Sequence, residues 1–332
     1  MAYKSKHTGK TIDDAIDLVK VSSNPNLLDN WYFGNPVNQR GKTDYSGSTY
    51  ASKIGLDRWW CRLGSTNTGA VKVESDGLVM DITEPQFFAV VQNIEHSEKL
   101  CGRTCTASIL VTENTINDSR GGARLTVSYQ DIGTANVGTT VGYANYDGIG
   151  LYSTTFTFPE TLAENQCFKF VISAVNSSNG STATSGHVKV LAAKLELGSA
   201  QTLAHQENGV WVLNEIPNYA DELAKCQRYC QVFNYRGSNY AQGYGVANSA
   251  SNINVSIPLA VQMRTTPTIN DTSGRNWTVR SNGSILNCSS VSVWYSSGTS
   301  LGLQFTVDGA VASHIAVVNS NSDALIVLSA DL

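Results

Sequence analysis

The stretch Ile216-Pro-Asn-Tyr-Ala-Asp-Glu-Leu-Ala-Lys-Cys-Gln-Arg-Tyr-Cys-Gln-Val-Phe233 separates two regions whose residues have the pattern of strands and turns. Its apolar residues step by 3, 4, 3, 4, 3, which predicts an amphipathic helix. The same spacing is that of an a/d seam, through which helices from separate chains pack together. The seam consists of Ile216, Tyr219, Leu223, Cys226, Cys230 and Phe233. We therefore expect a β-rich body, one linking helix and a β-rich tip.

The ends and charges of this stretch also favour a helix. Pro217 prevents a helix from continuing in from upstream, and the side-chain oxygen of Asn218 can cap the first turn. Asp221 and Glu222 stand in the first turn and Lys225 further on, as the helix dipole favours. The seam is too short to form a coiled coil alone, so a helix packed on its own domain is an equally good interpretation.

Composition excludes several classes of function. Charged residues make up 15% of the 332 residues, below the roughly 25% of an average domain, which suits short strands joined by tight turns. The net charge of −4 is mild and there is no large basic patch, so we expect no nucleic-acid partner. No apolar run reaches the length of a membrane span, so no membrane insertion is expected.

The first residues and the cysteines indicate folding in a reducing compartment. The segment Met1-Ala-Tyr-Lys-Ser-Lys-His7 lacks the apolar core of a secretory signal, so a role outside the cell would require release by assembly and lysis. The chain has seven cysteines, an odd number with irregular spacing, which is a poor disulfide framework. We expect free, mostly buried thiols in a protein made in a cytoplasm.

Residues 24–200 are predicted to form a jelly-roll β-sandwich. The run Phe87-Phe-Ala-Val-Val-Gln92 is continuously apolar, and other segments alternate or are rich in β-branched residues. Roughly eight strands are expected, which suits two packed antiparallel sheets. The predicted segments are 71–73, 77–82, 87–92, 105–112, 123–129, 151–158, 167–173 and 187–197.

Residues 234–332 are predicted to form a second, smaller β-sandwich. The segment Asn252-Ile-Asn-Val-Ser-Ile-Pro258 alternates strictly, with its isoleucines and valine on one face. Further strands are expected within 283–295, 302–307, 312–318 and 323–329. Asn282-Gly283 and Asp308-Gly309 have the composition of two-residue hairpin turns.

The remaining segments are a head and a linker. Residues 1–23 are predicted to hold a short helix, because Ile12, Ile16 and Val19 step by 4 and 3. Residues 201–233 then form the linker and its helix. The predicted order is a head at 1–23, a sandwich at 24–200, a linker with a helix at 201–233 and a tip at 234–332.

Five motifs follow one another in a distinctive order. They are Asn26-Leu-Leu-Asp-Asn-Trp-Tyr-Phe33, Asn35-Pro-Val-Asn-Gln-Arg-Gly41, Asp57-Arg-Trp59, Ala193-Lys-Leu-Glu-Leu-Gly-Ser199 and Tyr219-Ala-Asp-Glu-Leu-Ala-Lys-Cys-Gln-Arg-Tyr229. Together they resemble the tail-fibre, or receptor-binding, proteins of bacteriophages and prophages. The head segment Thr8-Gly-Lys-Thr-Ile-Asp-Asp-Ala-Ile16 is similar to the N-terminal attachment segments of such fibres.

The resemblance covers residues 8–233 best and implies a homotrimeric fibre. At the tip it rests only on Ile257-Pro-Leu-Ala-Val-Gln-Met-Arg-Thr-Thr-Pro-Thr268 and Leu328-Ser-Ala-Asp-Leu332. It implies a body similar to galactose-binding-like sandwiches of carbohydrate modules, and attachment of the N-terminus to a phage tail or baseplate protein. Because the tips of such fibres vary strongly, it implies no binding residue here.

Local motifs for catalysis or metal binding are absent from the sequence. The five histidines are scattered, and no nucleophile elbow stands between a strand and a helix. Acidic pairs such as Asp13-Asp14 lie at predicted helix starts, where the helix dipole explains them. No cofactor is expected. A structural Ca²⁺ fits a sandwich of this kind, but no Asp-x-Asp-x-Asp-Gly loop supports one.

Aromatic residues near and within the tip are the candidate binding residues. Sugar rings present C–H faces that stack on aromatic side chains, and hydroxyls that amides can hydrogen-bond. The candidates for a glycan or receptor site are Tyr235, Arg236, Tyr240, Tyr244, Trp277, Trp294 and Tyr295. The alternative is that tyrosines beside the helix pack on neighbouring strands and that Trp294 fills the core. The adjacent Trp59 and Trp60 would point to opposite faces of a strand, one into the core and one to a subunit contact or sugar.

The sequence therefore predicts a non-enzymatic tail fibre located in the virion and made in the host bacterial cytoplasm. Its head would dock onto the particle, and its tip would bind a bacterial surface glycan or protein. Weak individual sites would act together through three-fold repetition. The alternatives are a tail-associated depolymerase that cuts capsule or wall polysaccharide, and a carbohydrate-binding module of a larger enzyme. A depolymerase would need two carboxyl groups roughly 5 to 9 Å apart across a groove.

Overall fold

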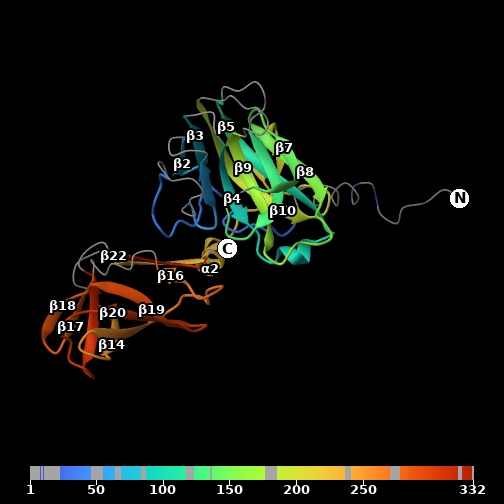
Figure 1. The fold of residues 1–332 in the computed structure, drawn as a ribbon. Helices are drawn as coiled ribbons and strands as arrows, with labels where there is room; N and C mark the ends of the chain where they lie inside the picture. The colour runs from blue at the N-terminus through green and yellow to red at the C-terminus, as the bar shows by residue number, and fades with distance from the viewer. Residues whose placement is uncertain are drawn as a thin grey trace. The chain divides into compact units, whose positions relative to one another are not determined.

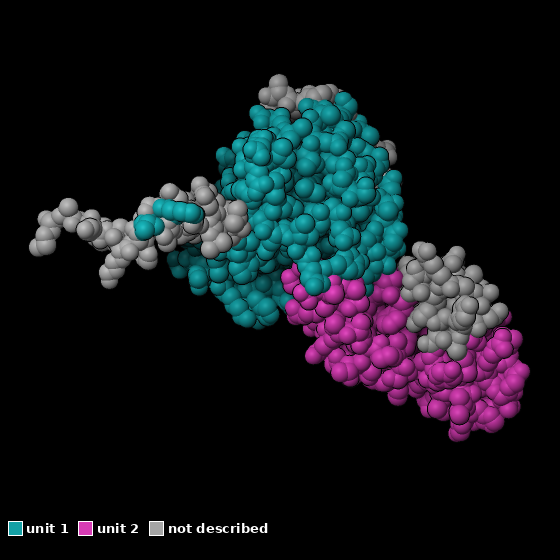
Figure 2. Space-filling view, turned by 180° about the vertical axis from the view of Figure 1, so that it is seen from behind, with its two compact units in different colours: residues 1–219 teal, residues 220–332 magenta. Residues whose placement is uncertain are grey.

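The computed structural model describes Thr8, Lys10 and residues 23–45, 55–63, 69–83, 87–116, 123–134, 137–175, 185–235, 241–269, 277–320 and 324–330 (Figure 1). The chain divides into two compact units, unit 1 at Met1–Tyr219 and unit 2 at Ala220–Leu332 (Figure 2). Their boundary falls inside the segment predicted as the linker. The helix predicted for the head, with Ile12, Ile16 and Val19, lies outside the described residues.

Unit 1 is a β-sandwich of two five-stranded antiparallel sheets. One sheet has the strand order β1-β4-β9-β6-β7 and the other has the order β2-β3-β10-β5-β8. The mainly-β sandwich predicted from the alternating segments is confirmed. The strands are β1 (Trp60–Leu63), β2 (Gly69–Glu74), β3 (Gly77–Ile82), β4 (Phe88–Asn93), β5 (Thr104–Asn114), β6 (Arg124–Asp131), β7 (Thr139–Asn145), β8 (Gly150–Thr157), β9 (Gln166–Val175) and β10 (Gly186–Leu197).

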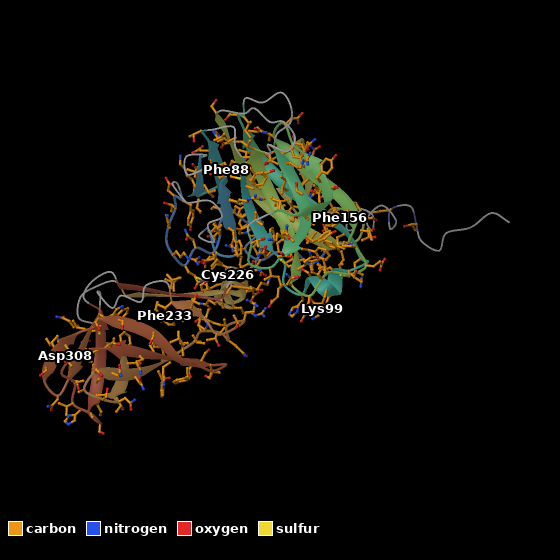
Figure 3. All side chains as sticks on the ribbon, viewed as in Figure 1. Phe88, Lys99, Phe156, Cys226, Phe233 and Asp308 are labelled. Carbon is orange, nitrogen blue, oxygen red and sulfur yellow. The ribbon has the colours of Figure 1, made fainter. Side chains whose placement is uncertain are left out.

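The core of unit 1 lies between these sheets. Each strand turns alternate side chains inward, so Phe168, Phe170 and Ile172 of β9 are fully buried. Phe88 of β4 and Phe156 of β8, both labelled in Figure 3, belong to the same cluster. A 3₁₀ helix, η1 (Ser97–Leu100), and a hairpin of β11 (Ala204–Glu207) and β12 (Val210–Leu213) complete the unit.

Two of the motifs that are distant in the sequence lie side by side. The segment 27–33 runs along β10, where the Leu27 amide donates to the Leu195 carbonyl at 2.8 Å and the Phe33 amide to the Leu191 carbonyl at 2.8 Å. The Asn26 side chain fixes the register, because its Oδ1 accepts from the Leu195 amide at 3.1 Å. These motifs therefore hold the sandwich together.

A polar network joins three of the motifs. Asp57 is 1% exposed and accepts from the Arg40 guanidinium at 2.9 Å and from the Gln39 amide at 2.6 Å. The neighbouring Arg58 donates to Asp29 at 2.9 Å. The indole of Trp59 donates to the Asn30 carbonyl at 2.9 Å. Buried charges need such partners, so this network fixes the segment that leads into the body.

Trp59 and Trp60 do point to opposite faces, as their adjacency predicts. Trp59 packs in the core against Phe33 and Phe170. Trp60 is 4% exposed and belongs to a separate buried cluster with Val91 and others. The expectation that one of the two lies on a subunit contact or a sugar face is therefore wrong for unit 1, because both are covered by the chain itself.

The two ends of the unit 1 body meet at one buried cation on β10. Lys194 is fully buried, and its amine donates to the hydroxyl of Ser23 and to the carboxylate of Glu215. Nearby, the Asn24 amide donates to the Thr202 hydroxyl at 2.9 Å. Lys194 thus connects the segment that enters the sandwich with the segment that leaves it.

Unit 2 is a smaller β-sandwich with a sheet of three strands and a sheet of seven. The orders are β13-β22-β16 and β18-β17-β21-β14-β15-β20-β19. A cluster that includes Ile253, Leu303, Phe305 and Leu328 fills the space between them. The strands are β13 (Cys230–Tyr235), β14 (Ala241–Ala247), β15 (Asn252–Pro258), β16 (Thr268–Ile269), β17 (Trp277–Ser281), β18 (Ser284–Asn287), β19 (Ser290–Ser296), β20 (Ser300–Thr306), β21 (Ile315–Ser320) and β22 (Ala324–Ser329).

One of the two predicted hairpin turns forms. Asn282 and Gly283 both have positive φ, 48° and 74°, and connect the paired strands β17 and β18. Asp308-Gly309 does not close a hairpin, because β20 pairs with β15 and β19 while β21 pairs with β14 and β17. Only Gly309 of this pair has positive φ, whereas a two-residue turn of this kind needs it at both positions.

The predicted helix is shorter than its apolar spacing suggests. Helix α2 spans Tyr219–Gln227 and begins directly after Asn218, the residue expected to cap it. It ends in a tight turn, in which the Tyr229 amide donates to the Cys226 carbonyl at 3.0 Å. Cys230 then starts β13, which pairs with β22. The prediction of a helix to Phe233 is wrong, because the β-forming run Gln231-Val-Phe233 joins a sheet instead.

The seam is consequently not one helical stripe. Ile216 precedes the helix and is exposed, as is Tyr219 in its first turn. Cys226 and Cys230 are buried within the chain, and Phe233 packs on the core of unit 2 (Figure 3). The homotrimer remains a prediction, and it no longer rests on a continuous a/d seam.

The cysteines give a direct test of the packing. All seven are free thiols; six are buried, and Cys101 is half-buried. Burial raises the pKa of Cys61 to about 12 and that of Cys105 to about 11. Because the thiolate is the reactive form, we expect Cys101 alone to react rapidly with a disulfide reagent at pH 8. Absorbance with and without denaturant measures this; rapid reaction of several thiols in the folded protein would contradict it.

Candidate functional site

The candidate site is a groove on the outer face of the seven-stranded sheet of unit 2. Its cavity volume is about 350 Å³, within the range of small-ligand sites. Alternate residues of β15 turn Val255 into the core and Asn254 and Ser256 outward. The residues that line the groove are Tyr244, Gly245, Val246, Asn248, Asn254, Val255, Ser256, Trp294 and Tyr295.

A β-bulge in β19 brings Trp294 to the surface. Val293 is paired with Leu303 and Tyr295 with Gly302, so Trp294 is an extra residue with no partner across the ladder. A bulge of this kind re-aims a side chain. Trp294 is 57% exposed, and its ring meets that of Tyr295 edge to face with centroids 5.1 Å apart. These two rings form one wall of the groove.

Tyr295 lies flat over a glycine. A Cβ added at Gly302 would stand 2.1 Å from Cδ1 of Tyr295, which is closer than any packed contact. The Tyr295 hydroxyl reaches across to β15 and donates to the Ser256 hydroxyl at 2.9 Å. The absence of a side chain at Gly302 therefore lets the ring occupy its place on the sheet.

The opposite wall comes from β14. Tyr244 is 71% exposed, and Val246, two residues on, also faces solvent. Tyr244 pairs with Val317 of β21 on the side away from the groove. Exposed rings on both sides of a groove leave apolar surface that a ligand can cover.

Amides and a hydroxyl lie between the two walls. Asn254 Oδ1 accepts from the Gln304 side-chain amide at 3.1 Å. Asn248 also lines the groove. Among its described lining residues there is no Asp, Glu, His, Lys, Arg or Cys. The groove thus offers stacking and neutral hydrogen bonding.

The structure brings three of the predicted site residues together: Tyr244, Trp294 and Tyr295 line the groove. Trp277 does not join them. It is 5% exposed and packs against Phe305 in the core, so its assignment to a binding surface is wrong. The alternative that Trp294 fills the core is also wrong, because this side chain is exposed.

The other candidates cannot be placed at the groove. Arg236 and Tyr240 lie outside the described residues, as does the side chain of Tyr235, whose backbone belongs to β13. Sequence reasoning missed the polar residues Asn248, Asn254 and Ser256. The outward positions of the alternating segment 252–258 were the signal that could have found the last two.

Outside the groove, the described ranges hold no group of three or more His, Cys, Asp or Glu side chains that could bind a metal ion. The described part of the chain also contains no helix that is both long and apolar enough to span a membrane.

Comparisons with known proteins give weak likenesses of fold. No family model and no curated protein matches the chain. The family 11 carbohydrate-binding module of a cellulase from Clostridium thermocellum is similar at 13% identity and a TM-score of 0.28, covering 46% of this chain and 96% of that one. The adhesin domain of Epf from Streptococcus pyogenes is similar at 10% identity and a TM-score of 0.29, covering 90% and 87%.

A phage protein is also among the similar structures. The enzymatically active domain of tailspike protein 4 from bacteriophage CBA120 is 11% identical, with a TM-score of 0.25, covering 52% of this chain and 21% of that one. At such scores these likenesses carry no argument about a ligand.

Proposed function

We propose that this chain is a receptor-binding protein of a phage or prophage tail fibre, and that the groove of unit 2 attaches it to a glycan on a bacterial surface. The observation that carries the glycan-binding part is the pair of exposed aromatic walls, Tyr244 on one side and Trp294 on the other, with amides between them. The five motifs that resemble tail fibres support the phage part.

The chemistry of the groove favours a sugar over a flat apolar ligand. A sugar ring is apolar on its C–H faces and polar around its rim. It can therefore stack on Trp294 while its hydroxyls reach Asn254 and Ser256, which lie between the walls. An apolar ligand would leave these polar groups without partners on desolvation, which costs free energy.

Binding to intact bacteria tests the proposal. The full chain, labelled with a fluorophore, is expected to bind cells of the host, and Trp294→Ala is expected to weaken this binding by about tenfold or more, since buried Trp anchors often dominate an interface. Tyr143→Ala is the matched control, because Tyr143 is an exposed aromatic of unit 1. Equal binding by the Trp294→Ala variant and the wild type would contradict the proposed site.

The products formed from the host polysaccharide distinguish attachment from the depolymerase alternative. The full chain is incubated with the host polysaccharide, and reducing ends are measured over time. We expect no release, because the groove's described lining carries no carboxyl group. Release of reducing ends by the wild type would contradict a function in attachment alone and would support the depolymerase. A carbohydrate-binding module of a larger enzyme would use the same groove. Detection of the chain in purified virions would support a tail fibre over such a module.

The homotrimer is part of the same proposal. A trimer would place three copies of the groove on one particle and raise the effective concentration of weak sites. Light scattering of the 35.7 kDa chain is expected to give three times this mass. A monomer at micromolar concentration would contradict the trimer. The binding role of the groove would still be tested by the cell-binding experiment.

A further inference from the structure

We infer that the groove recognises an N-acetylated sugar, whose acetamido carbonyl accepts a hydrogen bond from Asn254, and that Gln304 is the positioning residue that orients the Asn254 side chain. This rests on the proposed function, because it concerns the same site and specifies the class of glycan. Two observations carry it: the hydrogen bond between the side chains of Gln304 and Asn254, and the position of Val246 beside Asn254.

The register of the sheet places Asn254 between two different neighbours. Asn254 of β15 is paired with Val246 of β14 in one ladder and with Gln304 of β20 in the other. Residues directly opposite each other on antiparallel strands have Cβ atoms about 4.5–5.5 Å apart. Asn254 and Val246 line the groove, and Gln304 is not among its described lining residues. Asn254 therefore has the groove and Val246 on one side and Gln304 on the other.

Gln304 determines which end of the Asn254 amide faces the groove. Its Nε2 donates to Asn254 Oδ1 at 3.1 Å, so the amide oxygen is turned toward β20. The oxygen and the N–H₂ group of a carboxamide point in different directions, which leaves the N–H₂ group on the side of β14 and the groove. Within the described part of the chain this N–H₂ group donates to no acceptor. The groove thus presents a hydrogen-bond donor at Asn254.

Val246 places an apolar side chain beside this donor. Its side chain faces solvent and is 51% exposed. An acetamido group carries a carbonyl oxygen and a methyl group on the same carbon, so it requires a donor and an apolar contact close together. Asn254 can donate to the oxygen while the methyl group covers Val246. A hydroxyl at the same ring position would accept from Asn254 but would leave Val246 in water.

The aromatic residues lie next to this pair along the same two strands. Tyr244 precedes Val246 by two residues on β14 and therefore faces the same side. On β15, Ser256 follows Asn254 by two residues, and its hydroxyl accepts from the Tyr295 hydroxyl. Two residues of a strand span about 7 Å, which is comparable to a sugar ring with its acetamido group. One N-acetylated ring can therefore contact the aromatic rings and the acetamido pair together.

Calorimetry with matched sugars tests the inference on the full chain. The probes are methyl glycosides in pairs that differ only in the acetamido group: glucose and N-acetylglucosamine, galactose and N-acetylgalactosamine, mannose and N-acetylmannosamine. We expect at least one N-acetylated glycoside to bind about tenfold or more tightly than its partner. A difference smaller than this in every pair, including the absence of any binding, overturns the inference.

Two substitutions at Gln304 test its positioning role. In Gln304→Glu the new carboxylate only accepts, so Asn254 must turn its N–H₂ group toward it and its oxygen toward the groove. The preference for the N-acetylated sugar over its partner is expected to fall by about tenfold, the effect of one lost hydrogen bond. Gln304→Lys is the matched control, because its amine also adds a charge but still donates to Oδ1, and it should keep the preference within about twofold. An equal loss of affinity for both sugars in both variants would contradict the positioning role.

A substitution at Val246 tests the contact with the acetyl methyl group. Val246→Ala is expected to weaken binding of the N-acetylated sugar by about fivefold and to leave its partner little changed, because only the acetyl group covers this side chain. Ile315→Ala is the matched control: Ile315 is exposed and is paired with Val246 from the other side, but it is not among the described lining residues. Equal effects of the two variants would contradict the contact.

The outcomes separate this inference from the proposed function. If the matched sugars bind alike, or none binds, while cell binding still depends on Trp294, the inference fails and attachment through the groove remains supported. If cell binding does not depend on Trp294, the proposed site fails, and the inference fails with it.

Discussion

Replacing Asp57 by alanine is expected to lower the free energy of unfolding of unit 1 by about 3–5 kcal/mol, the range for removing one partner of a buried ion pair. Asp57 is 1% exposed and accepts from Arg40 and from the Gln39 amide. Without the carboxylate, the 12% exposed Arg40 side chain loses the anion it faces. Urea unfolding followed by tryptophan fluorescence measures the loss.

An exposed carboxylate of the same unit provides the control. Glu98 lies 3.3 Å from His96, and both side chains are more than half exposed. Glu98→Ala is therefore expected to change the free energy of unfolding by less than about 0.5 kcal/mol. If Asp57→Ala unfolds at the same urea concentration as Glu98→Ala, the network that joins the motifs is not what holds the segment in place.

Gly302→Ala is expected to weaken glycan binding strongly while unit 2 stays folded. The new Cβ would stand 2.1 Å from the Tyr295 ring, so the ring must leave the sheet and lose its hydrogen bond to Ser256. One wall of the groove would then be displaced, and we expect affinity for the bound glycan to fall by about a hundredfold. Calorimetry with that glycan measures the loss, and near-ultraviolet circular dichroism reports the moved aromatic pair.

A second glycine of the same region serves as the matched control. A Cβ at Gly298 would stand 3.4 Å from its nearest neighbour, the flexible side chain of Gln262, which is ordinary packing distance. Gly298→Ala should bind as the wild type does. Retained affinity in Gly302→Ala would mean that the Tyr295 ring is not part of the binding surface.

Much of the sandwich of unit 1 could be predicted from the sequence. The eight predicted segments correspond to β2 to β6 and β8 to β10, because buried strands carry apolar or β-branched residues at regular positions. The two missed strands lie at sheet edges. In β7, Gly142 interrupts the pattern and packs against Phe156, so a position that reads as a turn belongs to a strand.

The site could be predicted only in part. Composition suggested aromatic residues, and three of the seven candidates meet at the groove. It could not separate Trp277 from Trp294, because their exposure depends on the pairing of β19 with β20 and on a bulge of one residue. The pairing of strands distant in sequence, such as β14 with β21, has no local signal.

The helix shows how a short periodic pattern can mislead. Cys226 and Cys230 are four residues apart and both buried, as a helical stripe requires. One lies on α2 and the other on β13, so the two buried thiols come from two different elements. A stripe of this length is compatible with either arrangement, and pairing with β22 decides between them.

The position of Lys194 has a mechanical consequence. Ser23 precedes the sandwich and Glu215 follows it, and both contact this one side chain. Tension along the backbone would enter and leave unit 1 at nearly the same point. The pull would act on the contacts of Lys194 with Ser23 and Glu215 before it reached the hydrogen bonds of the two sheets. The sandwich would therefore remain intact under tension until those contacts broke.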